Sequence, residues 1–354
     1  MSLLYKPDLD EARRRWRAFW AGEIIDRPCA RIIAPRDGAQ PVSPPPSLQH
    51  PGYDLDQVLQ AQDRYLSTIY FAGEAIPFFM PNFGPDAYAA FLGADLGGFS
   101  EVDGTSWAIP FVQDWKEAID TLSRPHGYWW ENALSFTTRA RQFASGKFIV
   151  GMWDLHSNMD CLAALRGPQN LCTDLIDCPD DVEAALRVVR STYPVIFGAL
   201  YEASGEDETG CTTWLPMYCE QKFAAIECDF MCMISPEDAR RFVMPALEEE
   251  AAFLDHCCFH LDGPDALVHL DDILAIEAID AVQWVPGASA RPFVEWLDLL
   301  KKIQNAGKSL HAPVTPDEMK LLHKELRPEK VFYDVTARTQ SEADALLDWL
   351  VANT

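Results

Sequence analysis

The sequence predicts an α/β protein, a (β/α)8 TIM barrel with an N-terminal helical and loop extension. Short apolar runs near 257–261, 281–285, 308–312 and 330–335 alternate with helix-like stretches. Such alternation with short connections is typical of parallel strands joined by helices. Polar residues close each run, and a barrel builds its active site from polar groups at the carboxyl ends of its strands. We therefore expect an enzyme pocket supplied largely by the second half of the chain.

The first half supplies the extension and the first strands. Residues 1–74 are expected to pack on a barrel spanning 75–354, the whole forming one structural domain. Within the extension, 8–22 is predicted to be a helix and 29–34 a strand. Residues 35–53 are too rich in proline for a regular element. This stretch is either a lid near the barrel mouth or an ordinary surface loop.

The middle of the chain is predicted to be mostly helical. Helices are expected over 54–72, 129–144 and 180–203, and from 235 to about 257. One buried strand is expected at 148–153, because that run is apolar and ends at polar residues.

Length, charge and cysteine content exclude several classes of protein. The 354 residues carry 54 acidic and 29 basic side chains, a formal net charge of −25. Nucleic acids and anionic membranes need a positive face, so neither is an expected partner. The sequence has no long apolar span and no signal-peptide pattern, which favours a cytoplasmic protein. Ten cysteines without a C-x-x-C pair indicate reduced thiols, and the absence of Gly-rich phosphate motifs argues against a nucleotide cofactor.

Four segments follow an order found in one known superfamily. They are Gly84-Pro85 to Gly93-Ala94, Leu165-Arg166-Gly167-Pro168 to Cys178-Pro179, Asp229-Phe230 to Ser235-Pro236-Glu237, and His260-Leu261-Asp262-Gly263. This order resembles the uroporphyrinogen decarboxylase superfamily over roughly residues 75 to 352. The superfamily comprises haem-pathway decarboxylases and cobalamin-dependent methyltransferases that share one barrel.

The methyltransferase branch has a His-x-Cys at its fifth strand end and a further Cys at its eighth, which together bind a thiol-activating zinc. Here His260 matches the histidine, Asp262 replaces the first cysteine, and the region around Asp334 has no cysteine. The resemblance implies methyl transfer between a small substrate and a corrinoid. No corrinoid-binding motif is visible, so a partner protein would carry the corrinoid. A homodimer is common in the superfamily.

Two alternatives stay open. The decarboxylase branch grips substrate carboxylates with an Arg-rich N-terminal segment, for which Arg31 and Arg36 are the candidates in this chain. The alternative function is thus decarboxylation of a carboxylated ring compound. A barrel that binds a small molecule without catalysis is the other reading, because a fold does not fix a function.

The strand ends suggest a metal site. His260, Asp262 and His311 are the proposed ligands of zinc or another divalent transition metal, because imidazole and carboxylate suit such ions. Asp334 would bind or protonate the substrate. A hydrogen-bonded polar cluster without a metal is the alternative.

Further candidates lie in the middle of the chain. Asp154 and His156 follow a predicted strand and could form an acid–base pair, or else a helix cap with a surface histidine. Glu220 lies in aromatic and sulfur-rich sequence, where a raised pKa would suit a general acid, although it could equally reach solvent from the core.

Tryptophans recur near the predicted strand ends. Together with Arg31 and Arg36, the expected substrate-binding residues are Trp153, Trp214, Gln283 and Trp284. Their rings could form an apolar floor for a flat ligand, or they could be ordinary core residues.

Overall fold

The protein is built around a mostly parallel sheet. The structure is a computed structural model, and it describes residues 2–50, 52–100, 105–287 and 291–354. Among these described residues, seven strands form the main sheet, in the spatial order β2-β1-β13-β12-β11-β10-β9. They are β1 (Cys29–Pro35), β2 (Ile69–Gly73), β9 (Phe223–Ile226), β10 (His256–Asp262), β11 (Ala281–Val285), β12 (Ser309–Pro313) and β13 (Val331–Thr336). Only the β1–β2 pair is antiparallel among these neighbours.

The alternation predicted for the last part of the chain is confirmed. Each of the strands β10 to β13 is followed by helix before the next strand begins or the chain ends. These helical segments are η3 (Pro264–His269) with α12 (Leu270–Ala275), η4 (Phe293–Trp296) with α13 (Leu297–Asn305), α14 (Pro316–Leu322) with η5 (Pro328–Lys330), and α15 (Gln340–Asn353). Helix α14 starts where the sequence dictates, because Thr315 and Glu318 form a capping box and Pro316 takes the first position.

In the part of the chain that the structure describes, three strand pairs lie outside the main sheet. They are the parallel pair β3 (Phe78–Phe79) and β6 (Ile149–Val150), and the antiparallel pairs β4 (Asp95–Ser100) with β5 (Thr105–Ile109) and β7 (Cys211–Thr212) with β8 (Tyr218–Cys219). The amide of Met152, just past β6, donates to the Thr212 carbonyl at 2.7 Å, which joins β6 to β7. The fold is therefore mixed α/β with a central, mostly parallel sheet, and closure into eight strands stays a prediction.

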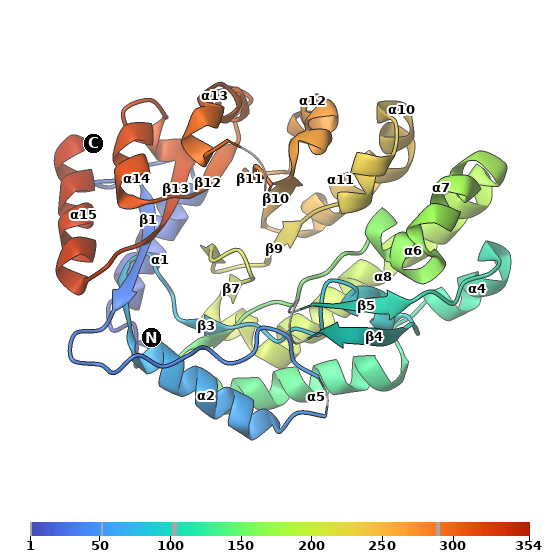
Figure 1. Cartoon of the computed structure of the whole chain (residues 1–354), viewed down its shortest axis with the longest axis horizontal. Helices are drawn as coiled ribbons and strands as arrows, with labels where there is room; N and C mark the ends of the chain where they lie inside the picture. The colour runs from blue at the N-terminus through green and yellow to red at the C-terminus, as the bar shows by residue number, and fades with distance from the viewer. Residues whose placement is uncertain (1, 51, 101–104, 288–290) are drawn as a thin grey trace.

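Helices surround the strands, as Figure 1 shows. Those before β10 are α1 (Leu9–Trp20), α2 (Leu55–Ser67), α3 (Ala87–Phe91), α4 (Trp115–Leu122), α5 (Gly127–Ala144), α6 (Met159–Arg166), α7 (Pro168–Asp177), α8 (Pro179–Ser204), α9 (Glu206–Thr209), η1 (Asp229–Met233), α10 (Pro236–Asp238), η2 (Ala239–Val243) and α11 (Met244–Phe253). The longer ones bury an apolar stripe; α1, for example, buries Leu9, Ala12, Trp16 and Phe19 at helical spacing.

One predicted element is wrong in its second part. The helix expected over 54–72 ends at Ser67, and Ile69–Gly73 is strand β2, paired antiparallel with β1. Its sequence, Ile-Tyr-Phe-Ala-Gly, begins with β-branched and aromatic residues, which favour a strand over a helix. The neighbouring strand β1 decides the outcome, because it offers a ladder of hydrogen bonds.

The extension contributes to the centre of the fold. Strand β1 lies within the main sheet, between β2 and β13. Helix α1 packs against the strands through Trp16, whose ring centroid lies 4.7 Å from that of Phe332 on β13. Within the described ranges, no helix combines the length and the apolar character needed to cross a bilayer.

Candidate active site

The polar residues predicted at strand ends do converge at one end of the sheet. His260 on β10 aligns with Gln283 on β11, which aligns in turn with His311 on β12. Arg31 on β1 aligns with Asp334 on β13. Parallel strands present their carboxyl ends to the same side, so these residues face a common mouth.

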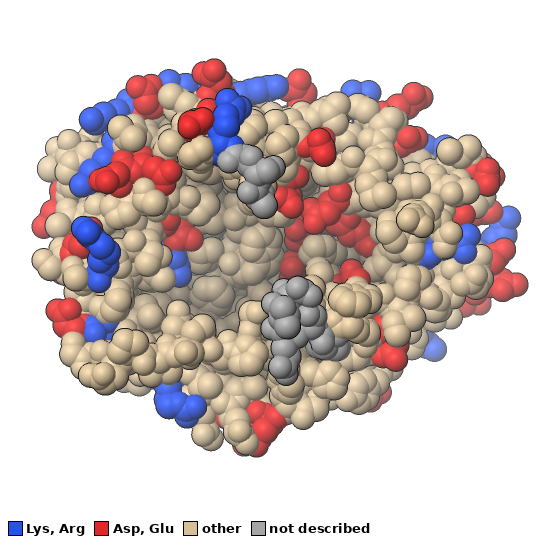
Figure 2. All heavy atoms as spheres, in the orientation of Figure 1, with Lys and Arg blue, Asp and Glu red and all other residues tan. Residues whose placement is uncertain are grey.

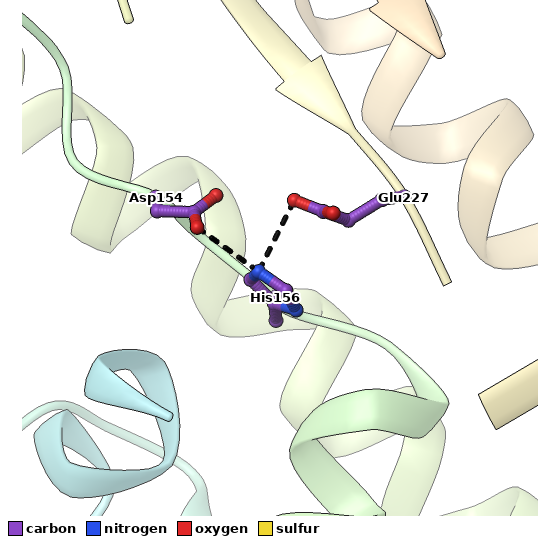
Figure 3. A group of neighbouring side chains, drawn as sticks. All are labelled: Asp154, His156 and Glu227. Atoms are coloured by element: carbon purple, nitrogen blue, oxygen red, sulfur yellow. Dashed lines mark hydrogen bonds and ion pairs between the residues drawn. The ribbon is translucent and has the colours of Figure 1, made fainter. Parts of the chain in front are cut away.

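His156 lies at the centre of a group of carboxylates at this mouth (Figure 3). Its Nε2 lies 3.2 Å from Asp154 Oδ2 and 3.1 Å from Glu227 Oε1. Its Nδ1 lies 3.5 Å from Asp160 Oδ2. Asp154 and His156 come from the loop after β6, and Glu227 directly follows β9. The predicted Asp154–His156 pair is therefore in contact, and it includes a carboxylate from a distant part of the chain.

Burial and neighbouring charges shift the pKa values of these residues in different directions. Burial lowers the pKa of His156, but Glu227 and Asp154 outweigh it and hold that pKa well above its usual value. Burial raises the pKa of Glu227 to about 8, although His156 opposes the rise. Burial also acts to raise the pKa of Asp154, yet His156 and further hydrogen bonds bring it below its usual value. A carboxyl that titrates near neutral pH is suited to proton transfer.

His260 forms a second group with Glu227 and Asp229. One ligand atom of each residue lies within 4.8 Å of the others, and His260 Nε2 is 4.0 Å from Glu227 Oε2. His260 Nδ1 lies 2.6 Å from Gln283 Oε1. With that amide oxygen as acceptor, Nδ1 is the donor, and Nε2 is the ring nitrogen directed at the group. We call Asp154, His156, Glu227, Asp229 and His260 the histidine–carboxylate cluster.

The cluster fits a divalent transition metal by its donor set. Imidazole nitrogen with carboxylate oxygens suits zinc and its neighbours in the first row. A neutral imidazole whose other nitrogen is held by a hydrogen bond is the usual form of a histidine ligand. The structure brings two groups of potential ligand atoms together, Asp154–His156–Glu227 and Glu227–Asp229–His260, and the second contains the histidine that is hydrogen-bonded to an amide oxygen.

The predicted ligand set is only partly assembled. Within the described residues, neither set of neighbouring ligand atoms contains Asp262 or His311. Asp262 is the last residue of β10, two residues beyond His260, and its side chain is exposed. His311 is buried against Phe332, with 5.3 Å between ring centroids. The structure thus replaces those two residues by Glu227 and Asp229 as neighbours of His260.

Arg31, Asp334 and His311 form a separate ion-pair group on the other side of the mouth. Arg31 Nη1 lies 2.5 Å from Asp334 Oδ1, and His311 Nε2 lies 3.4 Å from Asp334 Oδ2. Burial tends to raise the pKa of Asp334, but Arg31 and His311 lower it to about 2. Asp334 is therefore a fixed negative charge near neutral pH, and a proton-donating role does not fit it.

Two further predicted residues point elsewhere. Arg36 donates from Nη2 to the Ile69 carbonyl at 3.1 Å, so it is not aimed with Arg31 at one ligand. Glu220 pairs with Arg17 on α1 at 2.8 Å and precedes β9, whereas Glu227 follows that strand. Glu220 therefore lies at the amino end of the strands, opposite the mouth, and cannot share a site with His260.

Of the three tryptophans predicted to bind substrate, Trp214 alone lies beside the cluster. Its indole N–H donates to Asp154 Oδ1 at 2.9 Å, and its ring lies edge-on to His260 at 5.0 Å. Trp153 is buried in the core, where it donates to Thr137 and packs on Phe83.

Trp284 is fully buried against Trp296, with ring centroids 4.8 Å apart. Successive side chains on a strand face opposite sides, so Gln283 and Trp284 cannot both face the mouth. Gln283 faces it, and the prediction of substrate contact by Trp284 is wrong for this reason.

Two cavities adjoin these residues. One, of about 400 Å³, lies beside Arg31 and Trp214 and is walled by the Pro-rich loop and by β1 to β3. The other, of about 570 Å³, is lined by His156, Asp160 and Asp229 together with Trp107. Figure 2 shows the central hollow of this face, with acidic side chains gathered on the side toward α6.

A buried carboxyl supports the cluster from behind. Glu250 on α11 accepts hydrogen bonds from the Ser157 hydroxyl and, at 3.4 Å, from Asn158 Nδ2. The same Asn158 amide donates to the Glu227 carbonyl at 2.6 Å. Burial raises the pKa of Glu250 to about 8. Glu250 thus connects the loop that carries His156 with the end of β9.

The residues missed by sequence reasoning are mainly acidic. Glu227, Asp229, Asp160 and Glu250 were not among the predicted site residues. Glu227 carried a usable signal, because it is a carboxylate directly after the apolar run Phe223–Ile226. Glu250 carried none, since its neighbours Glu248 and Glu249 are typical of a solvated helix face.

One of three comparisons with known proteins finds a likeness, at the level of the fold. No family model matches the chain, and no curated protein matches it. Among solved structures, the chain is similar to a methyltransferase from Methanosarcina mazei, with a TM-score of 0.60 and 14% sequence identity. The match covers 97% of this chain and 98% of that chain. At this identity the likeness shows a shared fold over nearly the whole length.

Proposed function

We propose that this protein is a metal-dependent methyltransferase of the uroporphyrinogen decarboxylase superfamily, built on a closed (β/α)8 barrel. It would move a methyl group between a small substrate and a corrinoid carried by a partner protein. The observation that carries the proposal is the histidine–carboxylate cluster, which lies at the carboxyl ends of parallel strands in a fold shared with a methyltransferase. That end of such a sheet is where α/β enzymes place their chemistry.

Within the cluster, each residue has a distinct task. His260, held by Gln283, would bind the metal together with Glu227 and Asp229. A bound divalent metal supplies a Lewis acid that polarises a substrate heteroatom. Asp154 and Asp160 hold the His156 ring in place, and Trp214 fixes Asp154 by a hydrogen bond.

The protonation states favour an acid role at the same place. While no ion is bound, Glu227, with a pKa near 8, holds a proton at neutral pH, and it would give that proton up on binding the metal. The positively charged His156 ring lies 3.1 Å from Glu227 and compensates the negative charge of Glu227 when that carboxyl ionises. With Glu227 bound to the metal, the charged His156 would be the group that gives a proton to a leaving heteroatom as its methyl group departs.

The alternative of decarboxylation receives less support from the geometry. Its anchors would be Arg31 and Arg36, but Arg31 is paired with Asp334 and Arg36 with a backbone carbonyl. A polycarboxylate needs several unpaired cations, and a carboxylate brought to Arg31 would have to displace Asp334.

Elemental analysis tests the proposal directly. Protein purified without chelator, then loaded with zinc, cobalt or manganese and desalted, is expected to retain about one ion per chain. His260→Ala should lose that ion. His256→Ala is the matched control, because His256 is on the same strand at the opposite end. Retention of no ion by the wild type, or equal retention by His260→Ala, would contradict the metal-dependent function.

A corrinoid assay tests the reaction itself. Metal-loaded protein mixed with free methylcobalamin and a small thiol or amine acceptor is expected to change the corrinoid absorbance, and His260→Ala is not. Absence of any change across acceptors, in a protein that does retain metal, would keep the metal site and reject methyl transfer.

A further inference from the structure

The cavity beside Arg31 has an unusual balance of charge. We call it the Arg31 cavity; its volume is about 400 Å³, the size of a small-molecule site. Most of its wall is apolar, with Phe71, Phe78, Phe79 and Met80 among the residues that form it. Arg31 is the one charged residue among the described residues that line it. A ring-sized apolar molecule would therefore bury its surface there favourably.

The charge of Arg31 is already balanced. Asp334 accepts from Arg31 Nη1 at 2.5 Å and is held from its other side by His311 at 3.4 Å. A guanidinium has five N–H donors, so one bond to Asp334 leaves others for a ligand. An anionic ligand would be repelled by Asp334 and would compete with it for Arg31, whereas a neutral acceptor could bind Arg31 beside Asp334. A cationic ligand would be repelled by the positive charge of Arg31.

The wall of the cavity is fixed in place. Gln49, which is 1% exposed, ties the Pro-rich loop to the chain after β3. Its Oε1 accepts from the Asn82 amide at 2.7 Å, and its Nε2 donates to the Pro46 and Ser47 carbonyls at 2.8 and 2.9 Å. Pro44, Pro45 and Pro46 then form part of the lining. The loop, which was expected to be either a lid or an ordinary surface loop, therefore forms a fixed part of the wall of this cavity.

The cavity also adjoins the reactive residues. Trp214 lines it and, through its indole N–H, binds Asp154 of the histidine–carboxylate cluster. A ligand in the cavity therefore lies against one side of Trp214, next to the residues proposed for chemistry.

We infer that the Arg31 cavity binds an uncharged, largely apolar, ring-containing molecule with one hydrogen-bond acceptor directed at Arg31. This molecule is the small substrate of the protein. The second statement rests on the proposed function; the first, on binding, does not.

Three probes of similar size test the inference by calorimetric titration of the full chain. They are 3-phenylpropionamide, 3-phenylpropionate and 3-phenylpropylammonium, which share the ring and the three-carbon chain; the first two are isosteric and differ in charge, and the third ends in a cation without an acceptor. The amide is expected to bind at least about tenfold more tightly than either charged probe, a difference of about 1.4 kcal/mol. Tighter binding of the carboxylate or of the ammonium, or no binding of any probe, would overturn the inference.

Variants locate the binding. Ile33→Trp fills the cavity without changing a charge and should weaken amide binding by at least about tenfold, since steric exclusion removes the buried contact. Arg31→Met should weaken it by about tenfold through the lost hydrogen bond. Arg187→Met, an exposed arginine paired with Glu183 on α8, is the matched control and should bind normally. Amide binding that survives Ile33→Trp in a folded variant would overturn the assignment to this cavity.

One comparison separates this inference from the proposed function. His260→Ala should lose the metal and any methyl transfer, yet bind the amide as the wild type does. Absence of amide binding in a wild type that retains metal would count against the cavity alone, and absence of metal in a wild type that binds the amide would count against the proposed function alone.

Discussion

The two sides of the mouth use the same kinds of side chain with opposite electrostatic results. On the β1–β13 side, an arginine and a histidine face a single carboxylate, and the pKa of Asp334 falls to about 2. On the β9–β10 side, His156 faces Asp154, Asp160 and Glu227, and burial raises the pKa of Glu227 to about 8. The first side is neutral as a whole, and the second has a surplus of negative charge.

This difference indicates what each side can bind. A neutral, largely apolar wall suits an uncharged ligand, whereas surplus negative charge in a buried site suits a cation. Titratable groups with strongly shifted pKa values gather at functional sites more often than elsewhere. We therefore propose that the β9–β10 side carries out the chemistry and that the β1–β13 side binds the substrate.

The largest expected effect comes from removing the imidazolium of the acidic side. His156→Ala should lower the free energy of unfolding at pH 7 by roughly 3–5 kcal/mol, because it leaves buried carboxylates uncompensated. His311→Ala should cost less than half as much, since Asp334 keeps Arg31. Urea denaturation of both variants measures the difference. Equal losses would show that the two sides do not differ in their electrostatics.

The next effect depends on pH. The raised pKa of Glu250 means that the folded state keeps a proton which the unfolded state releases, so stability is lost as pH rises toward 8. Glutamine imitates the protonated form of Glu250. Between pH 5 and pH 8, the free energy of unfolding of Glu250→Gln should therefore fall by roughly 3 kcal/mol less than that of the wild type. Glu249→Gln on the exposed face is the control. Parallel pH profiles for wild type and Glu250→Gln would refute this role of Glu250.

On the neutral side the pH dependence has the opposite sign. The pKa of Asp334 is depressed to about 2, so its stabilisation is present above its usual pKa and is lost as pH falls toward 2. Between pH 4 and pH 2, the free energy of unfolding of the wild type should fall by about 2 kcal/mol more than that of Asp334→Asn, because the variant lacks the ion pair at every pH. Thermal unfolding across this range measures it. An acid-range loss in Asp334→Asn as large as that in the wild type would contradict a stabilising ion pair between Arg31 and Asp334.

The smallest effect is expected at the opposite end of the strands. Glu220→Ala removes a partly exposed pair with Arg17 and should change stability by no more than about 0.5 kcal/mol. Metal content and amide binding should stay unchanged. A loss of metal in this variant would mean that the metal site depends on both ends of the strands and is not confined to the mouth.

The fold class could be predicted from the sequence because its signals are local. Apolar runs of strand length, closed by polar residues and followed by caps, place β10 to β13 within a residue or two of their predicted bounds. The segment Ile69–Gly73 could not be assigned this way, since its strand conformation depends on pairing with β1. His260 and Gln283 were predicted at the mouth because both end apolar runs on neighbouring strands.

Only the tertiary structure decided which residues work together. The sequence by itself determined that histidines and carboxylates end successive strands, because strand ends follow from hydrophobic pattern and turn residues. It did not determine that Glu227 joins His156 and His260, or that Asp334 is neutralised by Arg31, since these contacts link segments far apart in the chain. A carboxylate's pKa depends on its burial and on the charges a few ångströms away. Both are properties of the folded arrangement, and the same kind of side chain became a fixed ion at Asp334 and a titrating group at Glu227.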